Sequence, residues 1–399
     1  MVRGVATVEP AADPKPFGAA DTAFGLDVMR AWCAQNPGQN LVFSPSTLES
    51  ALGMAYLGAR GATAAEMATV LHLPESSRAA LAAGLQARLK ALSSLDGPGV
   101  TVAASDQVWT DPTLTTLRSY LDEVATGYGA GVAKAPFSTD PAKAAAEINA
   151  AISAATRGHI TQLVDAGMLS RVGWVLTSAL YLDATWATPF DANQTQPASF
   201  TPTSGKRVTV PFMNGDAFPY ATAGGWQAVS LPYKGGKLTM TALLPPARSG
   251  ACALPSQAEM AAITGSLDGA SGAAAGSSVG TADVSLPKVD LDTSGGAGNM
   301  QPVLKRLGMG LAFTGNADFT GLSQQACCIG FVQQAATLQV GEKGTVGAAA
   351  AAVGMVPTSA LAVPRTITIT FNRPYLLLVS AKSTGEPLFL AEVANPASS

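Results

Sequence analysis

The stretch Val340-Gly-Glu-Lys-Gly-Thr-Val-Gly-Ala-Ala-Ala-Ala-Ala-Val-Gly-Met-Val356 decides how the rest of the chain is interpreted. No charged side chain follows Lys343 within it, and it is free of bulky side chains from Gly347 to Ala352. Five consecutive alanines favour a helix or a spacer, because alanine is the best helix former. Gly344 opposes a helix at the start of the segment, since glycine costs backbone entropy there. Taken alone, the composition favours the helix, so the surrounding chain must decide.

The bulk composition excludes several classes of protein. The chain has 399 residues, of which 47% are hydrophobic and 13% charged, with 24 basic and 27 acidic side chains and a net charge of -3. This balance lacks the basic footprint of a nucleic-acid or membrane-surface protein. No apolar run approaches the roughly 18 to 20 residues of a membrane-spanning helix. We therefore expect neither a nucleic-acid nor a membrane partner.

The first ten residues lack the continuous apolar core of a secretory signal. The compartment is left open by the sequence, as cytoplasmic or as secreted with the signal removed. Residues 1–15 contain Pro10 and Pro14 among small residues and predict a flexible tail, followed by a single domain over residues 16–399.

The four cysteines are Cys33, Cys252, Cys327 and Cys328. They are too few and too scattered for a disulfide framework, and vicinal cysteines do not readily bridge each other. We expect small buried hydrophobic side chains at these positions. The cysteines also lack the C-x-x-C spacing of a metal site, so no metal and no cofactor is expected.

Hydrophobic periodicity predicts a helical first part of the chain. Helices are expected over residues 21–33, 46–57, 63–71, 81–95, 114–128 and 141–156, with strands over 41–43, 100–109 and 172–182. Short strands then dominate, over residues 199–201, 207–213, 218–222, 226–232, 238–245, 283–292, 335–340, 365–371, 375–380 and 387–393. One more helix is expected over 301–308 and a flexible loop over 265–281. The absence of a βαβ rhythm favours an α+β fold with largely antiparallel sheets.

Five motifs, in chain order, resemble those of the serpins, the family of suicide-substrate protease inhibitors. They are Asn40-Leu-Val-Phe-Ser-Pro-Ser46, Ser178-Ala-Leu-Tyr-Leu-Asp-Ala-Thr-Trp186 with Pro189-Phe190, Val210-Pro-Phe-Met213, Leu286-Pro-Lys288 and Phe371-Asn-Arg-Pro-Tyr375. Each is weak alone, but five in order are specific. The resemblance implies the serpin fold, with about nine helices, three mostly antiparallel β-sheets and an exposed reactive-centre loop at about residues 342–364.

The resemblance also implies a mechanism. In this family a protease cleaves the reactive-centre loop, is trapped as an acyl-enzyme, and is distorted when the loop inserts as a new strand of the central sheet. The implied hinge residues are Glu342, Lys343, Gly344, Thr345, Gly347, Ala348, Ala349 and Ala350. An inserted strand alternates sides, and both sets of side chains from Thr345 onward are small. Insertion therefore requires no charge or large ring to be buried.

Serpins usually place the scissile bond at the seventeenth residue counted from the hinge glutamate, which gives Thr358-Ser359 here. Met355 and Leu361 remain alternatives, because the segment from Ser359 to Arg365 is longer than in many members. A Val-Pro pair before a small threonine suits an elastase-like or subtilisin-like serine protease. Lysine and arginine are absent from the loop before Arg365, which disfavours a trypsin-like target.

Two supporting clusters follow from the resemblance. The shutter beneath the insertion point would contain Ser44, Ser46, Ser178 and Gln334. Many serpins carry Asn and His where this chain has the last two, and Ser and Gln can still donate and accept hydrogen bonds. The breach at the top of the sheet would contain Trp186, Lys288 and Glu342, with Lys288 able to pair with Glu342.

An enzyme is disfavoured by the rest of the sequence. The only histidines are His72 and His159, and no Gly-x-Ser-x-Gly, His-Glu-x-x-His, Walker or dinucleotide motif occurs. We therefore expect structural histidines, no catalytic residues and a monomeric inhibitor. The alternative is a non-inhibitory serpin that acts as a binding or chaperone-like protein. Such members often carry bulky or charged hinge residues, which this chain lacks.

Overall fold

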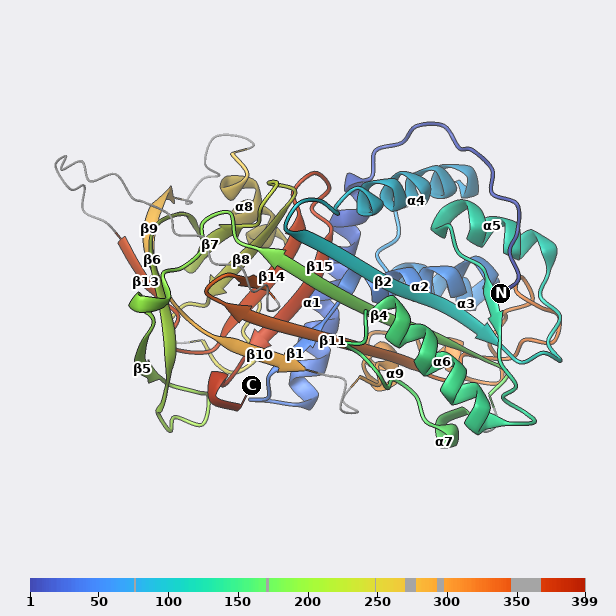
Figure 1. Ribbon diagram of the computed structural model, residues 1–399. Helices are drawn as coiled ribbons and strands as arrows, with labels where there is room; N and C mark the ends of the chain where they lie inside the picture. The colour runs from blue at the N-terminus through green and yellow to red at the C-terminus, as the bar shows by residue number, and fades with distance from the viewer. Residues whose placement is uncertain are drawn as a thin grey trace.

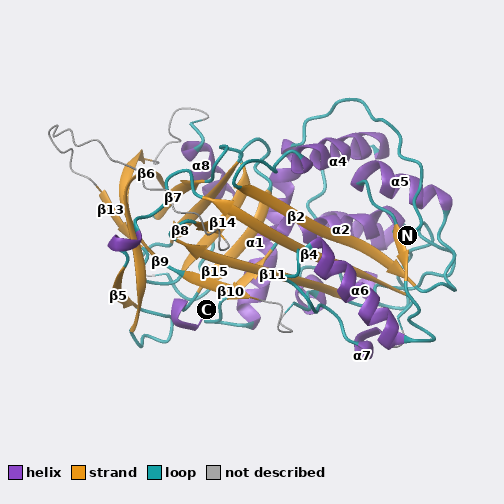
Figure 2. Cartoon of the chain, in the orientation of Figure 1, coloured by secondary structure: helices purple, strands orange, loops and turns teal. Residues whose placement is uncertain are grey.

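The computed structural model describes residues 1–74, 77–169, 172–247, 249–269, 278–292, 298–345 and 367–398. Over these residues the chain forms helices α1 to α9 and strands β1 to β15 (Figure 1). Most helices gather around one sheet at one end of the molecule, and strands dominate the other end (Figure 2). The expected α+β class is confirmed.

The helices are α1 (Lys15–Gln35), α2 (Pro45–Gly58), α3 (Gly61–Val70), α4 (Arg78–Ser93), α5 (Arg118–Tyr128), α6 (Pro141–Ala155), α7 (Ala166–Leu169), α8 (Gln257–Leu267) and α9 (Gln301–Arg306). Helix α2 begins after Ser44, whose side chain accepts a hydrogen bond from the Thr47 N–H. Helix α8 has no counterpart among the predicted elements. A capping box between Ser256 and Glu259 starts it, and this signal is visible in the sequence.

The central sheet has six strands in the order β10 (Val289–Asp292), β11 (Val332–Gly341), β12 (Gly344–Thr345), β4 (Trp174–Thr185), β2 (Val100–Thr110) and β3 (Val132–Lys134). Strand β4 is buried along almost its whole length, as its continuous apolar run predicts. It pairs antiparallel with β2 from Val100–Ala184 to Thr110–Trp174. It pairs in parallel with β11 only from Val332–Leu176 to Ala336–Leu180.

The second sheet has nine strands: β1 (Leu41–Phe43), β15 (Pro387–Val393), β14 (Tyr375–Ala381), β8 (Leu238–Leu244), β7 (Trp226–Pro232), β6 (Val208–Ala223), β9 (Ser278–Pro287) and β13 (Ile367–Thr370), with β5 (Gln196–Phe200) beside β6. The described residues thus form two hydrogen-bonded sheets where three were expected. The reason is β6, which pairs with β5, β7 and β9 along 16 residues and has an irregular register between Gly215 and Phe218. One bent strand therefore joins what would otherwise be two sheets.

The N-terminal segment, expected to be a flexible tail, has defined contacts in the structure. The Val2 N–H donates to the Val132 carbonyl at 2.7 Å, beside β3. The Val5 N–H donates to Asp122 on α5 at 2.6 Å, and the Thr7 N–H donates to Thr126 at 3.0 Å. The segment therefore lies along α5 before α1 begins.

The cysteine prediction is wrong for one pair. Cys33 at the end of α1 and Cys252 after β8 form a disulfide, with their Cα atoms 5.6 Å apart and 219 positions apart in sequence. Spacing along the chain could not reveal this pair, because the fold alone brings α1 to that loop. Cys327 and Cys328 are free, and Cys327 is exposed rather than buried. Among the described residues, no helix is long and apolar enough to cross a bilayer.

Candidate functional site

Two residues of the predicted hinge, Gly344 and Thr345, lie in the central sheet. Above Ala336, strands β11 and β4 no longer pair with each other, and β12 lies between them. Gly344 pairs with Gly341 on β11 and with Thr185 on β4, and Thr345 pairs with Val340 and Ala184. Strand β12 is antiparallel to both β11 and β4, because the chain turns back after β11 before it forms β12. Gly344 and Thr345 thus form a two-residue strand between β11 and β4.

Thr345 is fully buried at this position. Its hydroxyl hydrogen-bonds to the hydroxyl of Tyr233, and the Tyr233 ring stacks on Trp186 with centroids 4.4 Å apart. Gly344 is equally constrained, because a Cβ there would lie 2.0 Å from the Ala184 carbonyl oxygen. Only glycine therefore fits at the first inserted position, and only a small side chain fits at the second.

The three residues expected at the breach lie together around the turn between β11 and β12. Lys288 Nζ lies 3.0 Å from Glu342 Oε2, and the Thr195 hydroxyl donates to Glu342 Oε1 at 3.0 Å. The Trp186 indole Nε1–H donates to the Gly341 carbonyl at 2.9 Å, and its backbone N–H donates to the Lys343 carbonyl at 2.9 Å. These bonds hold the turn between β11 and β12, and the turn places β12 between β11 and β4.

The Glu342 contacts give the turn a pH dependence. Partial burial raises the pKa of Glu342, but its own N–H, Lys288 and Thr195 favour the carboxylate and bring the pKa below its ordinary value. A lowered carboxyl pKa stabilises the fold above the unfolded-state pKa, and this contribution is lost as pH falls through the folded-state value. The side chain is 18% exposed and Lys288 is 41% exposed, so the effect is modest.

We expect Glu342→Gln to lower the free energy of unfolding at pH 7 by about 1 kcal/mol, since it removes one ion pair and weakens one hydrogen bond. The difference from the parent should shrink at acidic pH, as the pH falls through the lowered folded-state pKa of Glu342 and the parent carboxylate becomes protonated. Denaturant unfolding at pH 7 and at acidic pH measures it. A deficit that persists unchanged at low pH would contradict the assigned role of the charge.

The four residues expected at the shutter lie in two separate pairs. Ser44 and Ser46 hydroxyls are 3.3 Å apart at the start of α2. Ser178 on β4 and Gln334 on β11 face each other in register and are buried. The Ser178 hydroxyl and both polar side-chain atoms of Gln334 have no hydrogen-bond partner among the described residues. Beneath the hinge, β4 and β11 are therefore held together by their backbone ladder without a side-chain latch.

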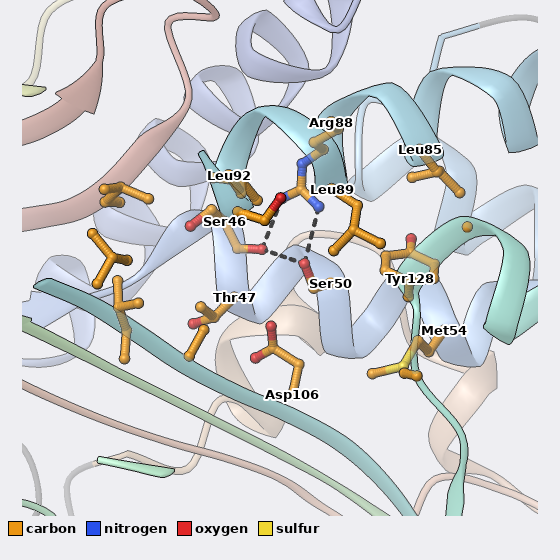
Figure 3. A pocket seen from close by; sticks show the side chains of 17 residues that line it. Ser46, Thr47, Ser50, Met54, Leu85, Arg88, Leu89, Leu92, Asp106 and Tyr128 are labelled. Atoms are coloured by element: carbon orange, nitrogen blue, oxygen red, sulfur yellow. Dashed lines mark hydrogen bonds between the residues drawn. The ribbon is translucent and has the colours of Figure 1, made fainter. Parts of the chain in front are cut away.

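A buried carboxyl that the sequence analysis missed lies beside this pair. Asp106 on β2 is opposite Ser178 on β4, and its Oδ1 atom has no hydrogen-bond partner within the described part of the chain. Figure 3 shows its carboxyl pointing from β2 towards α2, where Arg88 contacts Ser50. Burial raises the pKa of Asp106 well above its ordinary value, against the opposing positive charge of Arg88. The sequence signal that could have revealed this carboxyl is the presence of an aspartate within the predicted strand at residues 100–109.

The carboxyl of Asp106 lines a cavity of about 240 Å³ between the central sheet and helices α2 and α4. Arg88 on α4 also reaches this cavity, but its guanidinium is bound by Asp21, Glu49 and Glu386 at 2.7, 3.0 and 2.6 Å. Three buried carboxylates thus surround one buried cation. Arg88 also donates to the Ser50 hydroxyl and the Ser46 carbonyl, so its guanidinium N–H groups are engaged and it forms no ion pair with Asp106.

We expect Asp106→Asn to raise Tm at pH 8, because it removes a carboxyl group whose ionisation is opposed by desolvation. The folded-state pKa is raised, so the parent loses stability as pH rises above the ordinary aspartate value. The gain should therefore be smaller at pH 5 than at pH 8 in thermal unfolding. Asp216→Asn, at an exposed aspartate, is the matched control. Equal gains in Tm at pH 5 and pH 8 would contradict the conclusion that ionisation of Asp106 destabilises the fold.

Several predicted site residues lie outside the described residues. These are Gly347, Ala348, Ala349 and Ala350 of the hinge, Thr358 and Ser359 of the reactive bond, and the alternatives Met355 and Leu361. The two histidines are apart from the hinge. His72 Nε2 lies 2.9 Å from Asp27 Oδ2, and His159 stacks on Tyr181 with centroids 4.3 Å apart. Each histidine thus has a structural contact.

The structure is an α+β fold with a six-stranded sheet in which the short strand β12 lies beside β4. The Serpin family model, described as serine protease inhibitor, matches residues 19–396. The chain belongs to the serpin family, whose members are mostly protease inhibitors with a reactive loop that changes conformation.

Individual relatives cover nearly the whole chain. A serpin-like protein from Thermococcus kodakarensis is 31% identical over 96% of this chain and 86% of its own length. The leukocyte elastase inhibitor of Bos taurus is 29% identical over 95% of this chain and 99% of its own. Thyroxine-binding globulin in complex with thyroxine, a solved structure, has a TM-score of 0.75 at 24% identity and covers 95% and 99% of the two chains. The last similarity concerns the fold.

Proposed function

We propose that this protein inhibits serine proteases as a suicide substrate. A protease cleaves the reactive-centre loop at Thr358-Ser359, becomes trapped as an acyl-enzyme, and is carried along as the loop inserts between β4 and β11. Family membership supports protease inhibition in general. The observation that carries the specific proposal is β12, whose two residues already occupy the path that the loop would follow.

The strand geometry favours continued insertion. Strands β4 and β11 run parallel and share five pairs, from Val332–Leu176 to Ala336–Leu180. A loop that continues β12 runs antiparallel to both, so one short parallel ladder is replaced by two antiparallel ladders. Antiparallel pairing is slightly more stable per residue than parallel pairing. Inserting the loop therefore adds hydrogen bonds and improves their arrangement.

The shutter offers little side-chain resistance to this opening. Ser178 and Gln334, on the two strands that must separate, make no side-chain hydrogen bond with each other or with Ser44 and Ser46. Separating the strands thus breaks backbone bonds that the new strand replaces. The small residues that follow Thr345 in the sequence then add no charge and no large ring to the sheet.

The target is an elastase-like or subtilisin-like serine protease. The sequence Met355-Val-Pro-Thr358 presents a small residue before the scissile bond, which a shallow specificity pocket accepts. A relative at 29% identity is named as a leukocyte elastase inhibitor, which agrees with this class of target. The rival function is binding without inhibition, as suggested by the structural similarity to thyroxine-binding globulin. The small hinge and the entered strand β12 favour inhibition.

Incubating the protein with a limiting amount of elastase-like or subtilisin-like protease tests this function. We expect a time-dependent loss of protease activity that does not recover on dilution. Mass analysis of the released C-terminal peptide should give a fragment that begins at Ser359. A fragment that begins after Met355 or after Leu361 would assign the scissile bond to that residue and would still agree with the proposed mechanism. Complete loop cleavage with full protease activity would contradict inhibition of that protease.

A further inference from the structure

A second site lies at the disulfide, far from the hinge in sequence and separate from the inhibitory mechanism. We propose that, once the Cys33–Cys252 disulfide is reduced, the two thiolates and the Glu392 carboxylate bind one divalent metal ion of the zinc type. The three side chains come from three segments, namely the end of α1, the loop after β8, and β15. Only the fold brings them together.

The ligand atoms are already clustered. The two Sγ atoms and a carboxylate oxygen of Glu392 lie within 4.8 Å of one another. The Cα atoms of Cys33 and Cys252 are 5.6 Å apart. Two sulfurs on a tetrahedral zinc ion, each at about 2.3 Å, are about 3.8 Å from each other. Rotation of the Cys252 side chain, which is half-buried in its loop, can provide this sulfur–sulfur distance after reduction.

Glu392 is the second, independent indication of a ligand. It is 2% exposed, and its Oε2 atom is buried without a hydrogen-bond partner among the described residues. A buried carboxylate oxygen without a donor is costly unless it is paired or bound to a cation. Two thiolates and one carboxylate form a mixed set of soft and hard donors that suits zinc or cobalt better than magnesium or calcium.

The carboxylate end of the site, at Glu392, adjoins a cavity. Glu392 lines a cavity of about 460 Å³ whose other walls include Thr201, Pro245, Ala251 and Arg373. An ion can enter by this cavity, and a water molecule in it can supply the fourth ligand. Three protein ligands with an open fourth position are the arrangement of an accessible zinc site, in contrast to a closed structural one.

The chemistry requires a reductant, which we assign to the dithiol class. The dithiol gives two electrons and two protons to the sulfurs of Cys33 and Cys252 and becomes a cyclic disulfide, as the protein S–S bond breaks. The metal ion then replaces the two thiol protons, which leave to solvent as two metal–sulfur bonds form. The oxidised protein cannot bind the ion in this way, because its sulfurs carry no anionic charge.

The test uses cobalt as a coloured probe for zinc. Because Cys327 and Cys328 are free thiols, the full chain carries Cys327→Ser and Cys328→Ser. The protein is reduced with a phosphine, desalted under argon and titrated with Co²⁺. We expect a thiolate-to-cobalt charge-transfer band that saturates at one ion per chain and disappears when Zn²⁺ is added. The oxidised protein should give no band.

Glu392→Gln tests the contribution of the carboxylate to metal binding separately from that of the two thiolates. In the oxidised state its disulfide still closes the loop, so the fold of this variant is checked by circular dichroism before reduction. After reduction we expect Co²⁺ affinity to fall by at least about tenfold, in line with the sensitivity of metal sites to their surroundings. Asp216→Asn, at an exposed carboxyl, should leave the affinity unchanged. A reduced parent without the band, or Glu392→Gln with parental affinity, would overturn the proposal.

Discussion

Thr345→Arg should convert this protein from an inhibitor of its target protease into a substrate. Thr345 is fully buried between β11 and β4, with its hydroxyl against Tyr233. An arginine there must either bury its charge in the sheet or keep the second residue of β12 outside it. Either outcome opposes insertion at its first step. We therefore expect the loop to be cleaved, the acyl-enzyme to hydrolyse, and active protease to be released.

The expected effect is large because a buried, unpaired charge is expensive. A penalty above about 3 kcal/mol is typical when a charge is buried without its partner. If that penalty is felt in the transition state of insertion, the step slows by more than about 100-fold. Hydrolysis of the acyl-enzyme then wins the competition. The number of inhibitor molecules consumed per protease molecule inactivated is the quantity to measure.

Thr345→Ser is the matched control, since it keeps the small size and the hydroxyl that faces Tyr233. We expect this variant to inhibit like the parent. If Thr345→Arg still inactivates protease at the parental stoichiometry, insertion does not proceed through the position where the structure places β12. A loss of inhibition in both variants would instead point to a general effect of changing the hinge.

Cleavage of the reactive-centre loop should raise Tm strongly. A new central strand of about 14 residues adds on the order of 10 net hydrogen bonds, each worth about 1 kcal/mol. Unfolding a chain of 399 residues has an entropy of about 0.8 kcal/mol per kelvin, at about 2.1 cal/mol/K per residue. The increase in Tm is then about 12 °C, a shift that calorimetry resolves without difficulty.

The control for this prediction is the Thr345→Arg variant, cleaved in the same way. Its Tm should rise far less than that of the parent, because its loop is held out of the sheet. A parent whose Tm stays the same after complete loop cleavage would contradict insertion, even if it inhibits a protease by another route.

Local patterns in the sequence were sufficient for much of the fold. Strands β7 and β15 have the predicted bounds, because turn residues bracket a run of apolar residues in each case. The burial of β4 followed from its continuous apolar run. The five motifs led to the family, which the match to residues 19–396 confirms. Patterns of this kind depend on residues that are adjacent in the sequence, so a single sequence is enough to detect them.

The features that escaped prediction depend on neighbours in space. Cys33 and Cys252 are 219 positions apart, and no spacing rule joins them. Asp106 looked like an ordinary polar position in an alternating strand, although the neighbouring residues of α2 and α4 decide its burial. The entry of Gly344 and Thr345 into the sheet was also not determined by the sequence, because it depends on where β11 and β4 separate.

The pairing of Ser178 with Gln334 shows the same limit within the candidate site. Family resemblance identified the positions, and the structure places them in register on the two strands that must part. The residue types could have formed a hydrogen-bonded latch, but the side chains find no partners among the described residues. If the loop inserts as proposed, the β4–β11 backbone ladder is what the insertion must break.

Covalent trapping of a serine protease, as the loop inserts, is the event on which the proposed function depends. The most direct measurement is denaturing electrophoresis of the protein mixed with elastase-like and subtilisin-like proteases, with intact-mass analysis of any new band. We expect a complex that survives boiling in detergent, with the mass of the protease plus the inhibitor lacking its C-terminal peptide. Clean cleavage of the loop without such a complex, for every protease of both classes, would contradict the proposed function.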